Sequence, residues 1–489
     1  MSDTDFRPQA RSPRGFQDRR AAQLRVERGI LAAVSAVYER WGFEALDTPA
    51  FEYADALGKF LPDSDRPNEG VFALQDDDEQ WMALRYDLTA PLARFAAETW
   101  ETLPKPFRRY AFGTVWRNEK PGPGRFREFI QCDADTVGSD RPEADAEIIA
   151  MAAEGLTAAG LPRGAAVIRI NNRKLVNAVM ASAGVSDPKR ELAVLRAIDK
   201  LDKFGPEGVQ LLLGPGRMDE SGDFTRGAEL EAKNVDKVMA YVCAPASSKR
   251  TGFIEAMGAA LGDAPGAEAA LSELASIAKA LDGMGVSEDQ ARFDPAVVRG
   301  LEYYTGAVFE AELTANDAQG DPLRLGSIGG GGRYDGLVAR FTGAANPATG
   351  FSFGVSRLAY ALGRIGAAAP HVRGPVVVIA FSEAHMGAYF ALARELRDAG
   401  LPAEVYLGRS GMKAQMKYAD RRLSPAAVIV GDDELAAGSV TIKDLDLGRA
   451  MAAKLADHGS WKSERPGQLT VPRAEMTAVV RRIVEAAGG

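Results

Sequence analysis

The residues best suited to chemistry lie in a short, arginine-rich segment. Between Lys105 and Arg127 the chain has seven lysine or arginine residues and a single acid, Glu119. Residues 108–117 and 125–135 have the composition of strands, and the sequence NEKPGPG between them predicts a hairpin. Arginine suits phosphate, because its planar guanidinium matches two phosphate oxygens at once. The segment is therefore either a solvated sheet face or a cationic hairpin that binds a polyphosphate.

The second strand of this hairpin is expected to have one almost wholly polar face. Side chains of a strand alternate between its two sides, so every second residue shares a face. If the hairpin is a binding site and not a solvated face, this row of cationic, amide and carboxylate groups would hold a polyphosphate and an amino acid at once. The residues of this face are Arg125, Arg127, Phe129, Gln131, Asp133 and Asp135.

Length and composition indicate a multidomain protein of a reducing compartment. At 489 residues the chain is too long for one compact domain, and roughly two to four are expected. The N-terminus lacks the apolar core of a secretory signal, and apolar runs such as 376–381 are far too short to cross a bilayer. Two cysteines, Cys132 and Cys243, argue against a disulfide framework or a cysteine-based zinc site. We therefore expect a cytoplasmic protein.

The scarcity of histidine limits the chemistry of any site before residue 371. The chain has three histidines, His371, His385 and His458. An earlier site works without a histidine base or a histidine-rich metal cage, which favours charge stabilisation around an already ionised nucleophile. The net charge of −8 excludes little, because a local basic patch can still bind nucleic acid.

The first part of the chain has the spacing of mixed helices and strands. Residues 20–41 have the apolar spacing of a helix, and residues 43–51 predict an edge or interface strand interrupted by Pro49. Residues 84–89 predict a short strand. One face of that strand would carry Arg85, Asp87 and Thr89.

The remainder predicts a helical insertion, a second set of strands and a separate domain. Residues 187–285 are Ala-rich, charged and helical in character. The glycine-rich residues 326–336 predict tight turns, and residues 351–355 predict a strand that leads into a helix near Arg357. After Pro370 strands alternate with helices, which predicts a small α/β domain with a largely parallel sheet.

Several residues are ambiguous when taken alone. The glycines 329–332 lack the pattern of a Walker loop or a dinucleotide fingerprint, so they predict a close-packed turn. Arg357, at the head of an apolar helix, is either a surface residue or part of an anion site, because helix N-termini attract anions. Arg299 has the same two interpretations, and Tyr303 and Tyr304 fit either a core or a site.

Taken together, these segments resemble the class II aminoacyl-tRNA synthetases, and specifically the histidyl-tRNA synthetase family. The segment FEALDTP resembles motif 1, VWRNEKPGPGRFREF resembles motif 2, and GVSRL is similar to motif 3. VRGLEYY and GGGGRYDGL resemble stretches specific to the histidine family, and LRYDLT resembles a eukaryotic form of another. GMKAQMKYADRR and VIVGDDELAAGSVTIKDL resemble the family's anticodon-binding domain. The resemblance covers essentially the whole chain.

The resemblance implies an α+β catalytic domain with the antiparallel six-stranded sheet of class II synthetases. A helical insertion and a C-terminal α/β anticodon-binding domain would accompany it, in a homodimer that has no membrane association. The expected boundaries are 1–186 and 288–369 for the two parts of the catalytic domain, 187–287 for the insertion, and 370–489 for the anticodon-binding domain with an extension.

The implied activity is activation of L-histidine with ATP and Mg²⁺, followed by transfer of histidine to tRNA(His). The attacking carboxylate is already ionised, so the demand is charge neutralisation and alignment. By resemblance, Arg117 contacts the α-phosphate and Arg357 the γ-phosphate. Arg299 would lie opposite Arg117, in place of a metal ion of other class II enzymes, so no metal ligand is assigned. Arg125 would approach the phosphates or the tRNA end.

The resemblance also implies which groups recognise the amino acid. Asp135 and Tyr304 would each hydrogen-bond one imidazole nitrogen, with Tyr303 alongside. A site that pairs both nitrogens rejects isosteres by leaving its own polar groups unpaired, so editing is unnecessary. The residues that would hold the α-ammonium group are Asp87, Thr89 and Gln131.

The hairpin loop 118–124 would meet the acceptor end of the tRNA. Lys120 and Gly122 stand where typical bacterial relatives have an arginine and a glutamine that read an extra 5′ guanosine. Lysine offers a point charge and glycine no side chain, so base recognition is expected to weaken here.

Two other functions share this fold. One is the synthetase-like regulatory subunit of ATP phosphoribosyltransferase in histidine biosynthesis, which typically lacks the anticodon-binding domain and some catalytic arginines. This chain keeps Arg117, Arg299 and Arg357 together with the C-terminal domain. The other is a synthetase-like tRNA sensor, which would be expected within a larger multidomain chain.

Overall fold

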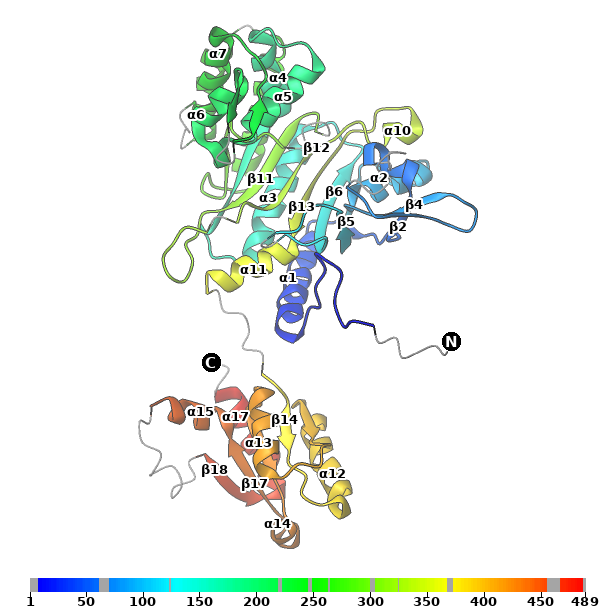
Figure 1. The fold of residues 1–489 in the computed structure, drawn as a ribbon, viewed down its shortest axis with the longest axis vertical. Helices are drawn as coiled ribbons and strands as arrows, with labels where there is room; N and C mark the ends of the chain where they lie inside the picture. Colours follow the sequence, from blue (N-terminus) through cyan, green and yellow to red (C-terminus); the bar gives the residue numbers. More distant parts are fainter. Residues whose placement is uncertain are drawn as a thin grey trace. The chain divides into compact units, whose positions relative to one another are not determined.

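The chain forms two compact units, Met1–Ala368 and Ala369–Gly489, each with its own apolar core (Figure 1). The units are described separately below, from a computed structural model. The structure describes residues 8–60, 70–122, 125–218, 222–244, 249–262, 264–299, 304–323, 325–366, 373–454 and 467–486.

The first unit is built on a mixed sheet. From β5 to β7 each strand is antiparallel to the next, whereas β1 and β10 pair in parallel at the two edges. The expected antiparallel six-stranded sheet is therefore confirmed, with one parallel strand added on each side. In pairing order the strands are β1 (Glu44–Ala45), β5 (Phe107–Trp116), β6 (Glu128–Val137), β13 (Ala348–Gly354), β12 (Ser327–Arg333), β11 (Ala307–Leu313), β7 (Ala166–Asn172) and β10 (Ala291–Phe293).

Helices α1 (Ala21–Arg40), α3 (Pro142–Ala158) and α11 (Val355–Arg364) pack against one face of this sheet. Cys132 and Ala134 of β6 belong to the apolar core there, as does Phe353 of β13. The packing is close, since a Cβ on Gly155 of α3 would lie 2.9 Å from the Phe353 ring. Because side chains alternate along a strand, Gln131, Asp133 and Asp135 belong to the opposite face.

Residues 327–333 form the strand β12, so the prediction of tight turns in this glycine-rich segment was wrong. Its glycines pair with β11 on one side and β13 on the other. A Cβ on Gly331 would lie 2.6 Å from the Phe309 ring, and one on Gly332 would lie 2.8 Å from the Tyr304 ring. Glycine is needed here because aromatic rings approach the backbone from both faces of the sheet.

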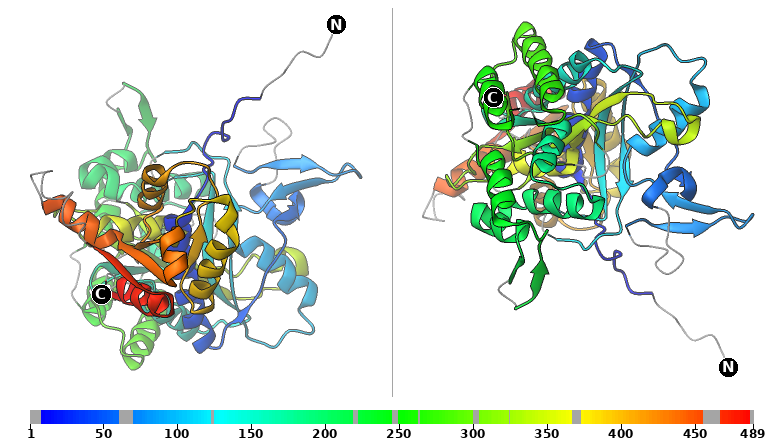
Figure 2. Two further views of the ribbon diagram at one scale, coloured as in Figure 1. Left: turned by 90° about the horizontal axis from the view of Figure 1, so that it is seen from below. Right: turned by 90° about the horizontal axis from the view of Figure 1, so that it is seen from above.

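Two other expected strands differ from the prediction. β4 (Trp81–Leu84) ends before Asp87, whose carboxylate accepts the first N–H groups of α2 (Thr89–Thr99). The single strand expected over residues 43–51 is replaced by two short strands on either side of Pro49, which cannot donate a ladder hydrogen bond. β1 joins the main sheet, whereas β2 (Phe51–Tyr53) pairs with β4, which also pairs with β3 (Ala73–Gln75). The β3–β4 hairpin projects away from the main sheet (Figure 2).

The segment between β7 and β10 is mostly helical, and it also contains the hairpin of β8 (Gly216–Met218) and β9 (Phe224–Arg226). Many of its buried side chains continue the core of the main sheet. Its helices are α4 (Arg173–Ser182), α5 (Pro188–Ile198), α6 (Leu201–Leu213), α7 (Ala232–Val242), α8 (Arg250–Leu261) and α9 (Ala267–Gly283). Two short helices elsewhere in this unit are η1 (Ala54–Phe60) and α10 (Ala339–Thr342).

The second unit has a five-stranded sheet in the order β15 (Ala403–Val405), β14 (Val376–Val378), β16 (Ala426–Ile429), β17 (Ser439–Asp444) and β18 (Gln468–Pro472). The first three strands are parallel and the last two antiparallel, so the expectation of a largely parallel sheet holds for part of it. Its helices are η2 (Glu383–His385), α12 (Met386–Asp398), α13 (Met412–Arg421), α14 (Asp432–Ala437), α15 (Leu445–Lys454), η3 (Arg473–Glu475) and α17 (Met476–Ala486). Among the described residues of both units, no helix is long and apolar enough to cross a membrane.

Candidate active site

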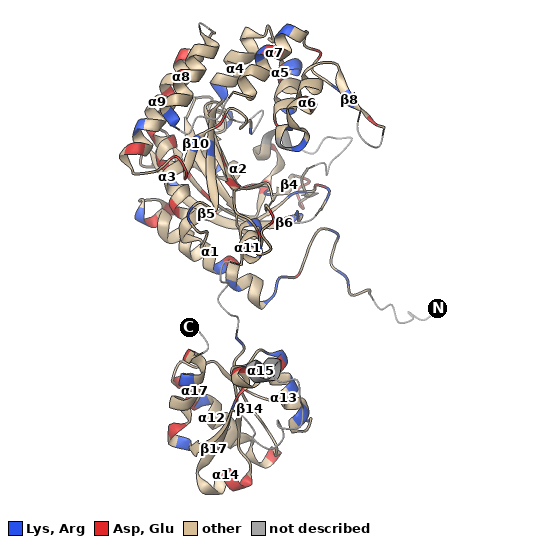
Figure 3. Ribbon diagram, turned by 90° about the vertical axis from the view of Figure 1, so that its left-hand side faces the viewer, with Lys and Arg blue, Asp and Glu red and all other residues tan. Residues whose placement is uncertain are grey.

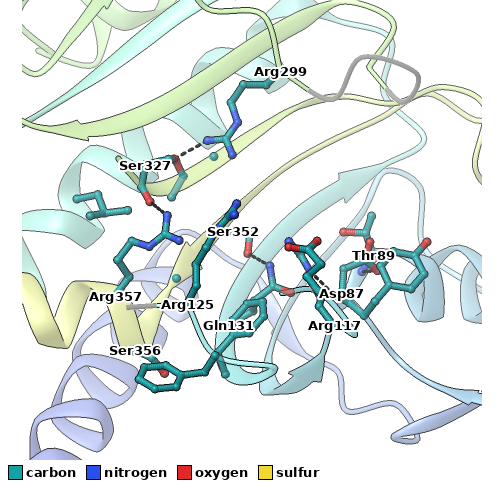
Figure 4. Close-up of a pocket in the computed structure, with 18 of the residues that line it drawn as sticks. Asp87, Thr89, Arg117, Arg125, Gln131, Arg299, Ser327, Ser352, Ser356 and Arg357 are labelled. Carbon is teal, nitrogen blue, oxygen red and sulfur yellow. Dashed lines mark hydrogen bonds between the residues drawn. The ribbon is translucent and has the colours of Figure 1, made fainter. Parts of the chain in front are cut away.

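A cavity of about 630 Å³ lies on the face of the main sheet that α1, α3 and α11 leave open (Figure 4). Its volume suits a small-molecule ligand of a few tens of atoms. The structure brings nine of the expected residues to its lining: Asp87, Thr89, Arg117, Lys120, Arg125, Gln131, Arg299, Tyr304 and Arg357.

The register of the sheet shapes the floor of this cavity. Asp133 of β6 pairs with Ser352 of β13 on one side and with Ala111 of β5 on the other. Gln131 pairs in the same way with Gly354 and Gly113. These neighbours have small side chains or none, although the guanidinium of Arg85 lies over Gly113, 2.3 Å from where a Cβ would be. The floor is therefore polar along β6.

Four arginines from three parts of the chain reach this cavity. Arg117 follows β5, stacks 5.2 Å from the centroid of the Phe129 ring, and donates from Nε to the Tyr86 carbonyl at 3.1 Å. Arg357 lies in the first turn of α11 and donates to the Ser327 carbonyl at 2.5 Å. Arg125 lies just before β6.

Arg299 is held by two partners from neighbouring strands. Its Nη1 donates to Glu310 of β11 at 2.8 Å and to the hydroxyl of Ser327 of β12. A Cβ on Gly330 would lie 2.7 Å from this nitrogen, so the guanidinium lies directly over the glycine strand.

The arginines form a strongly positive end of the cavity. Burial lowers the pKa of Arg357, and the positive charges of Arg125, Arg299 and Arg117 lower it further. Cations held this close repel one another unless an anion lies between them. The N-terminus of α11 adds a partial positive charge beside Arg357. This end of the cavity is therefore suited to a polyphosphate.

Hydrogen-bond acceptors gather at another part of the lining. Asp87 accepts through Oδ1 from the N–H groups of Thr89 at 3.0 Å and Ala90 at 2.9 Å. Burial raises the pKa of Asp87, and these N–H groups and Arg117 offset part of that rise. Gln131 donates from Nε2 to the Ser352 hydroxyl at 2.8 Å, which leaves its amide oxygen available as an acceptor.

Asp135 lies beneath the cavity and is not part of its lining. Its carboxylate accepts from the hydroxyl of Tyr334, and Oδ2 lies 2.9 Å from Nη2 of the fully buried Arg109. A Cβ on Gly350 would lie 1.8 Å from its Oδ1, so this carboxylate fits only beside a glycine. Contact between Asp135 and an imidazole nitrogen remains a prediction.

The other expected residues are placed less centrally. Tyr304 lines the cavity, and burial raises the pKa of its hydroxyl. Gly122 is exposed and pairs with Arg125 in the hairpin loop. Tyr303 lies outside the described residues.

Asp133 lines the cavity, in agreement with its predicted place in the polar row of this strand, but the resemblance implied no ligand contact for it. Alternation along β6 puts it on the same face as Gln131. Burial raises the pKa of Asp133 to about 8, and the negative charge of Asp135 contributes to the rise. Arg109 and a hydrogen bond from Ser352 act in the opposite direction. Ser327 and Tyr86 also line the cavity without having been predicted.

Substituting Asp133 by asparagine is expected to stabilise the protein, and more so as pH rises. A carboxyl whose pKa is raised by folding keeps a proton that the unfolded chain has already lost, between the pKa of an ordinary aspartate and about 8. Stability of the native chain therefore falls with increasing pH by up to about 1.4 kcal/mol per unit in this window. Asparagine does not titrate, so it removes this contribution.

The measurement is the difference in melting temperature between Asp133→Asn and the native chain at pH 5.5 and at pH 7.5. The difference should be larger at pH 7.5. An equal difference at the two pH values would contradict the raised pKa.

A six-stranded antiparallel sheet, an arginine-lined cavity on its open face and a separate α/β unit define a class II aminoacyl-tRNA synthetase. Comparison with known families agrees. The family model described as Histidyl-tRNA synthetase matches residues 15–358, and the model described as Anticodon binding domain matches residues 375–461. The chain belongs to the histidyl-tRNA synthetase family.

Individual relatives match over nearly their full length. The chain is 66% identical over 484 residues to the Histidine--tRNA ligase of Caulobacter vibrioides, with 98% of each chain covered. It is 52% identical over 494 residues to the Histidine--tRNA ligase of Brucella ovis, with 99% of this chain and 98% of the relative covered.

Solved structures give the same architecture. The histidyl-tRNA synthetase from Nostoc sp. PCC 7120 superposes with a TM-score of 0.72 at 28% identity, covering 97% of this chain and 100% of that one. A Bacillus halodurans protein described as an ATP phosphoribosyltransferase regulatory subunit/histidyl-tRNA synthetase superposes at 0.66 over 84% of this chain and 97% of its own. Its identity is 24%, so that likeness concerns the fold alone.

Proposed function

We propose that this protein activates L-histidine with ATP and transfers it to tRNA(His). The observation that carries the proposal is the joining, in one cavity, of an arginine-rich end with an acceptor-rich part built around Asp87 and Gln131. The first suits the phosphates of ATP and the second an ammonium group. The sequence identity of 66% and 52% to two histidine–tRNA ligases, each over nearly the full length, supports the choice of amino acid.

In the first step an oxygen of the histidine carboxylate attacks the α-phosphorus of ATP. The new P–O bond forms as the bond to the pyrophosphate oxygen breaks, and no proton is transferred. The protein's task is to neutralise charge and hold the reactants in line. We assign the α-phosphate to Arg117 and the γ-phosphate to Arg357. Arg299 then stabilises the charge that develops opposite Arg117.

Magnesium would enter this site with ATP. The described residues contain no group of three acidic, cysteine or histidine side chains able to hold a metal ion. We therefore expect the distal phosphates and water to supply the ligands of Mg²⁺, with no dedicated protein cage.

Recognition of histidine would divide between its two ends. Asp87, Thr89 and Gln131 are assigned to the α-ammonium group. Tyr304 and Asp135 are each assigned to one imidazole nitrogen, with Tyr303 alongside. Arg125 would approach the phosphates or the tRNA end.

The two units would have separate roles. Residues 1–186 and 288–369 form the proposed catalytic domain, residues 187–287 its insertion, and residues 370–489 the anticodon-binding domain. We also propose a cytoplasmic homodimer. Support for the dimer comes from large apolar side chains that remain exposed on the β2–β4–β3 sheet, since exposed patches of this kind mark interaction surfaces. They are Phe51, Tyr53, Leu74 and Trp81.

The decisive experiment is histidine-dependent exchange of labelled pyrophosphate into ATP, followed by charging of total tRNA with each of the twenty amino acids. A histidyl-tRNA synthetase exchanges pyrophosphate with histidine and charges tRNA with histidine alone. A regulatory subunit of ATP phosphoribosyltransferase would do neither, and would instead alter the rate of that transferase.

The enzyme is expected to depend little on an extra guanosine at the 5′ end of its tRNA. Lys120 lines the cavity and Gly122 is exposed in the hairpin loop, and neither offers the planar edge that reads a base. Phosphate contacts position a nucleic acid, whereas base contacts specify it. Removing this nucleotide should lower kcat/KM by less than about tenfold, or about 1.4 kcal/mol. Two transcripts, with and without the nucleotide, are charged side by side. A loss above about 100-fold would show that the loop reads the base.

A further inference from the structure

Asp133 is a buried carboxylate that faces the cavity with an unused acceptor. Its side chain is part of the lining, yet the residue is only 2% exposed. Oδ1 has no hydrogen-bond partner among the described residues, and the same is true of Oε1 of Gln131. Leaving a buried acceptor unpaired is costly, so the two oxygens indicate a ligand that donates hydrogen bonds.

A short chain of hydrogen bonds fixes the direction of both acceptors. The Ser352 hydroxyl accepts from Nε2 of Gln131 at 2.8 Å (Figure 4). It has one proton of its own, which it donates to the Asp133 carboxyl group. Ser352 therefore pairs with the amide nitrogen of Gln131 and with one oxygen of the Asp133 carboxyl group. Oε1 of Gln131 and Oδ1 of Asp133 are left for the ligand.

The charges around Asp133 favour a cationic donor. The titratable and charged groups coupled to it are Asp87 before α2, Cys132 and Asp135 on β6, Tyr304 before β11, Tyr38 on α1, Arg109 on β5 and Arg85 before α2. Arg109 already lies against Asp135, and Arg85 donates to the carbonyl oxygens of Thr48 and Thr114. Three acids, Asp87, Asp133 and Asp135, therefore lie near two cations, Arg109 and Arg85.

We propose that Asp133 accepts a hydrogen bond from the α-ammonium group of histidine, beside Asp87 and Gln131. This inference rests on the proposed function and adds a specificity-determining residue to it. An ammonium group has three N–H donors, which matches three acceptors on Asp87, Gln131 and Asp133. A neutral imidazole has a single N–H and cannot satisfy them. Phosphate has no N–H to donate to these acceptors, and the arginines that suit it lie at the other end of the cavity.

Binding of histidine at Asp133 is expected to be coupled to the release of a proton. Because burial raises the pKa of Asp133 to about 8, the empty site holds a proton at pH 7. An ammonium group stabilises the ionised carboxylate, so binding of histidine releases that proton to solvent. The released proton comes from the Asp133 carboxyl group, so the Asp133→Asn variant should not release it.

The test compares binding of two ligands to the native chain and to Asp133→Asn by calorimetry. The ligands are L-histidine and 3-(imidazol-4-yl)propionate, which lacks the α-amino group. Asp133→Asn should weaken histidine about 10- to 100-fold, as expected for a charged hydrogen bond. It should change the affinity for the propionate less than about threefold, because a substitution that removes no contact with the ligand has only a small effect. Asp289→Asn, an exposed carboxylate in the same unit, is the matched control and should leave both affinities unchanged.

Equal weakening of both ligands would assign Asp133 to the ring or carboxylate and overturn the proposal. Unchanged binding of histidine would also overturn it. Repeating the histidine titration in two buffers of different ionisation enthalpy measures proton release, which the native chain should show in excess of Asp133→Asn. Asp133→Ala provides a second variant. If the native chain fails to exchange pyrophosphate with histidine, the proposed function fails; if it exchanges normally and Asp133→Asn binds like the native chain, only this inference fails.

Discussion

Replacing Arg299 by alanine is expected to slow single-turnover formation of histidyl-adenylate by about 10²–10³-fold. Binding of histidine should change little, because the guanidinium acts on charge that develops in the transition state. Its position is well defined, since Glu310 and Ser327 both accept from Nη1. The side chain also lies over Gly330, where no neighbouring Cβ competes for the space.

Rapid-quench measurement of adenylate, with histidine affinity measured in parallel, separates these two effects. Arg292→Ala is the matched control, because Arg292 is exposed on the edge strand β10 and is not part of the cavity lining. A loss below about tenfold in the Arg299 variant would refute its role at the reacting phosphate. A parallel loss of histidine affinity would point instead to general damage to the site.

A chain that ends at Ala368 is expected to form adenylate but to lose about 10²–10⁴-fold in kcat/KM for tRNA. This is the range by which a second linked binding module raises overall affinity. The first unit contains the whole cavity and the core of the main sheet, so its chemistry does not require the second. Pyrophosphate exchange and tRNA charging are measured on the same preparation, with a melting curve to show that the shortened chain is folded.

Point variants in the full chain test the same role without truncation. Helix α13 has basic residues along its length (Figure 3), among them Lys413, Lys417 and Arg421 at intervals of four residues. All three are exposed. Their joint replacement by alanine should weaken tRNA charging and leave pyrophosphate exchange intact. Arg394→Ala on α12 is the control, since that arginine is exposed and lies within hydrogen-bond reach of Asp398. Equal charging by the shortened and full-length chains would refute the anticodon-binding assignment.

The sequence by itself determined the local features of the site. The alternation from Phe129 to Asp135 placed the polar row on one face of a strand, because side-chain direction in a strand depends only on position along it. The density of arginine around the hairpin indicated an anion site, and the near absence of histidine indicated chemistry without a general base. Each of these inferences concerns residues close in sequence or the composition of the chain.

Only the tertiary structure decided how deep each group lies and which groups meet. Asp133 and Asp135 share a face, yet Asp133 lines the cavity while Asp135 lies beneath it against Arg109 and Tyr334. That difference depends on the partner strands: Ser352 is paired beside Asp133, and Gly350 beside Asp135. The glycines of β12 were likewise misjudged as turns, because the aromatic rings that require them come from distant segments. Pairing register and depth are set by long-range contacts, so one local sequence pattern is compatible with several of them.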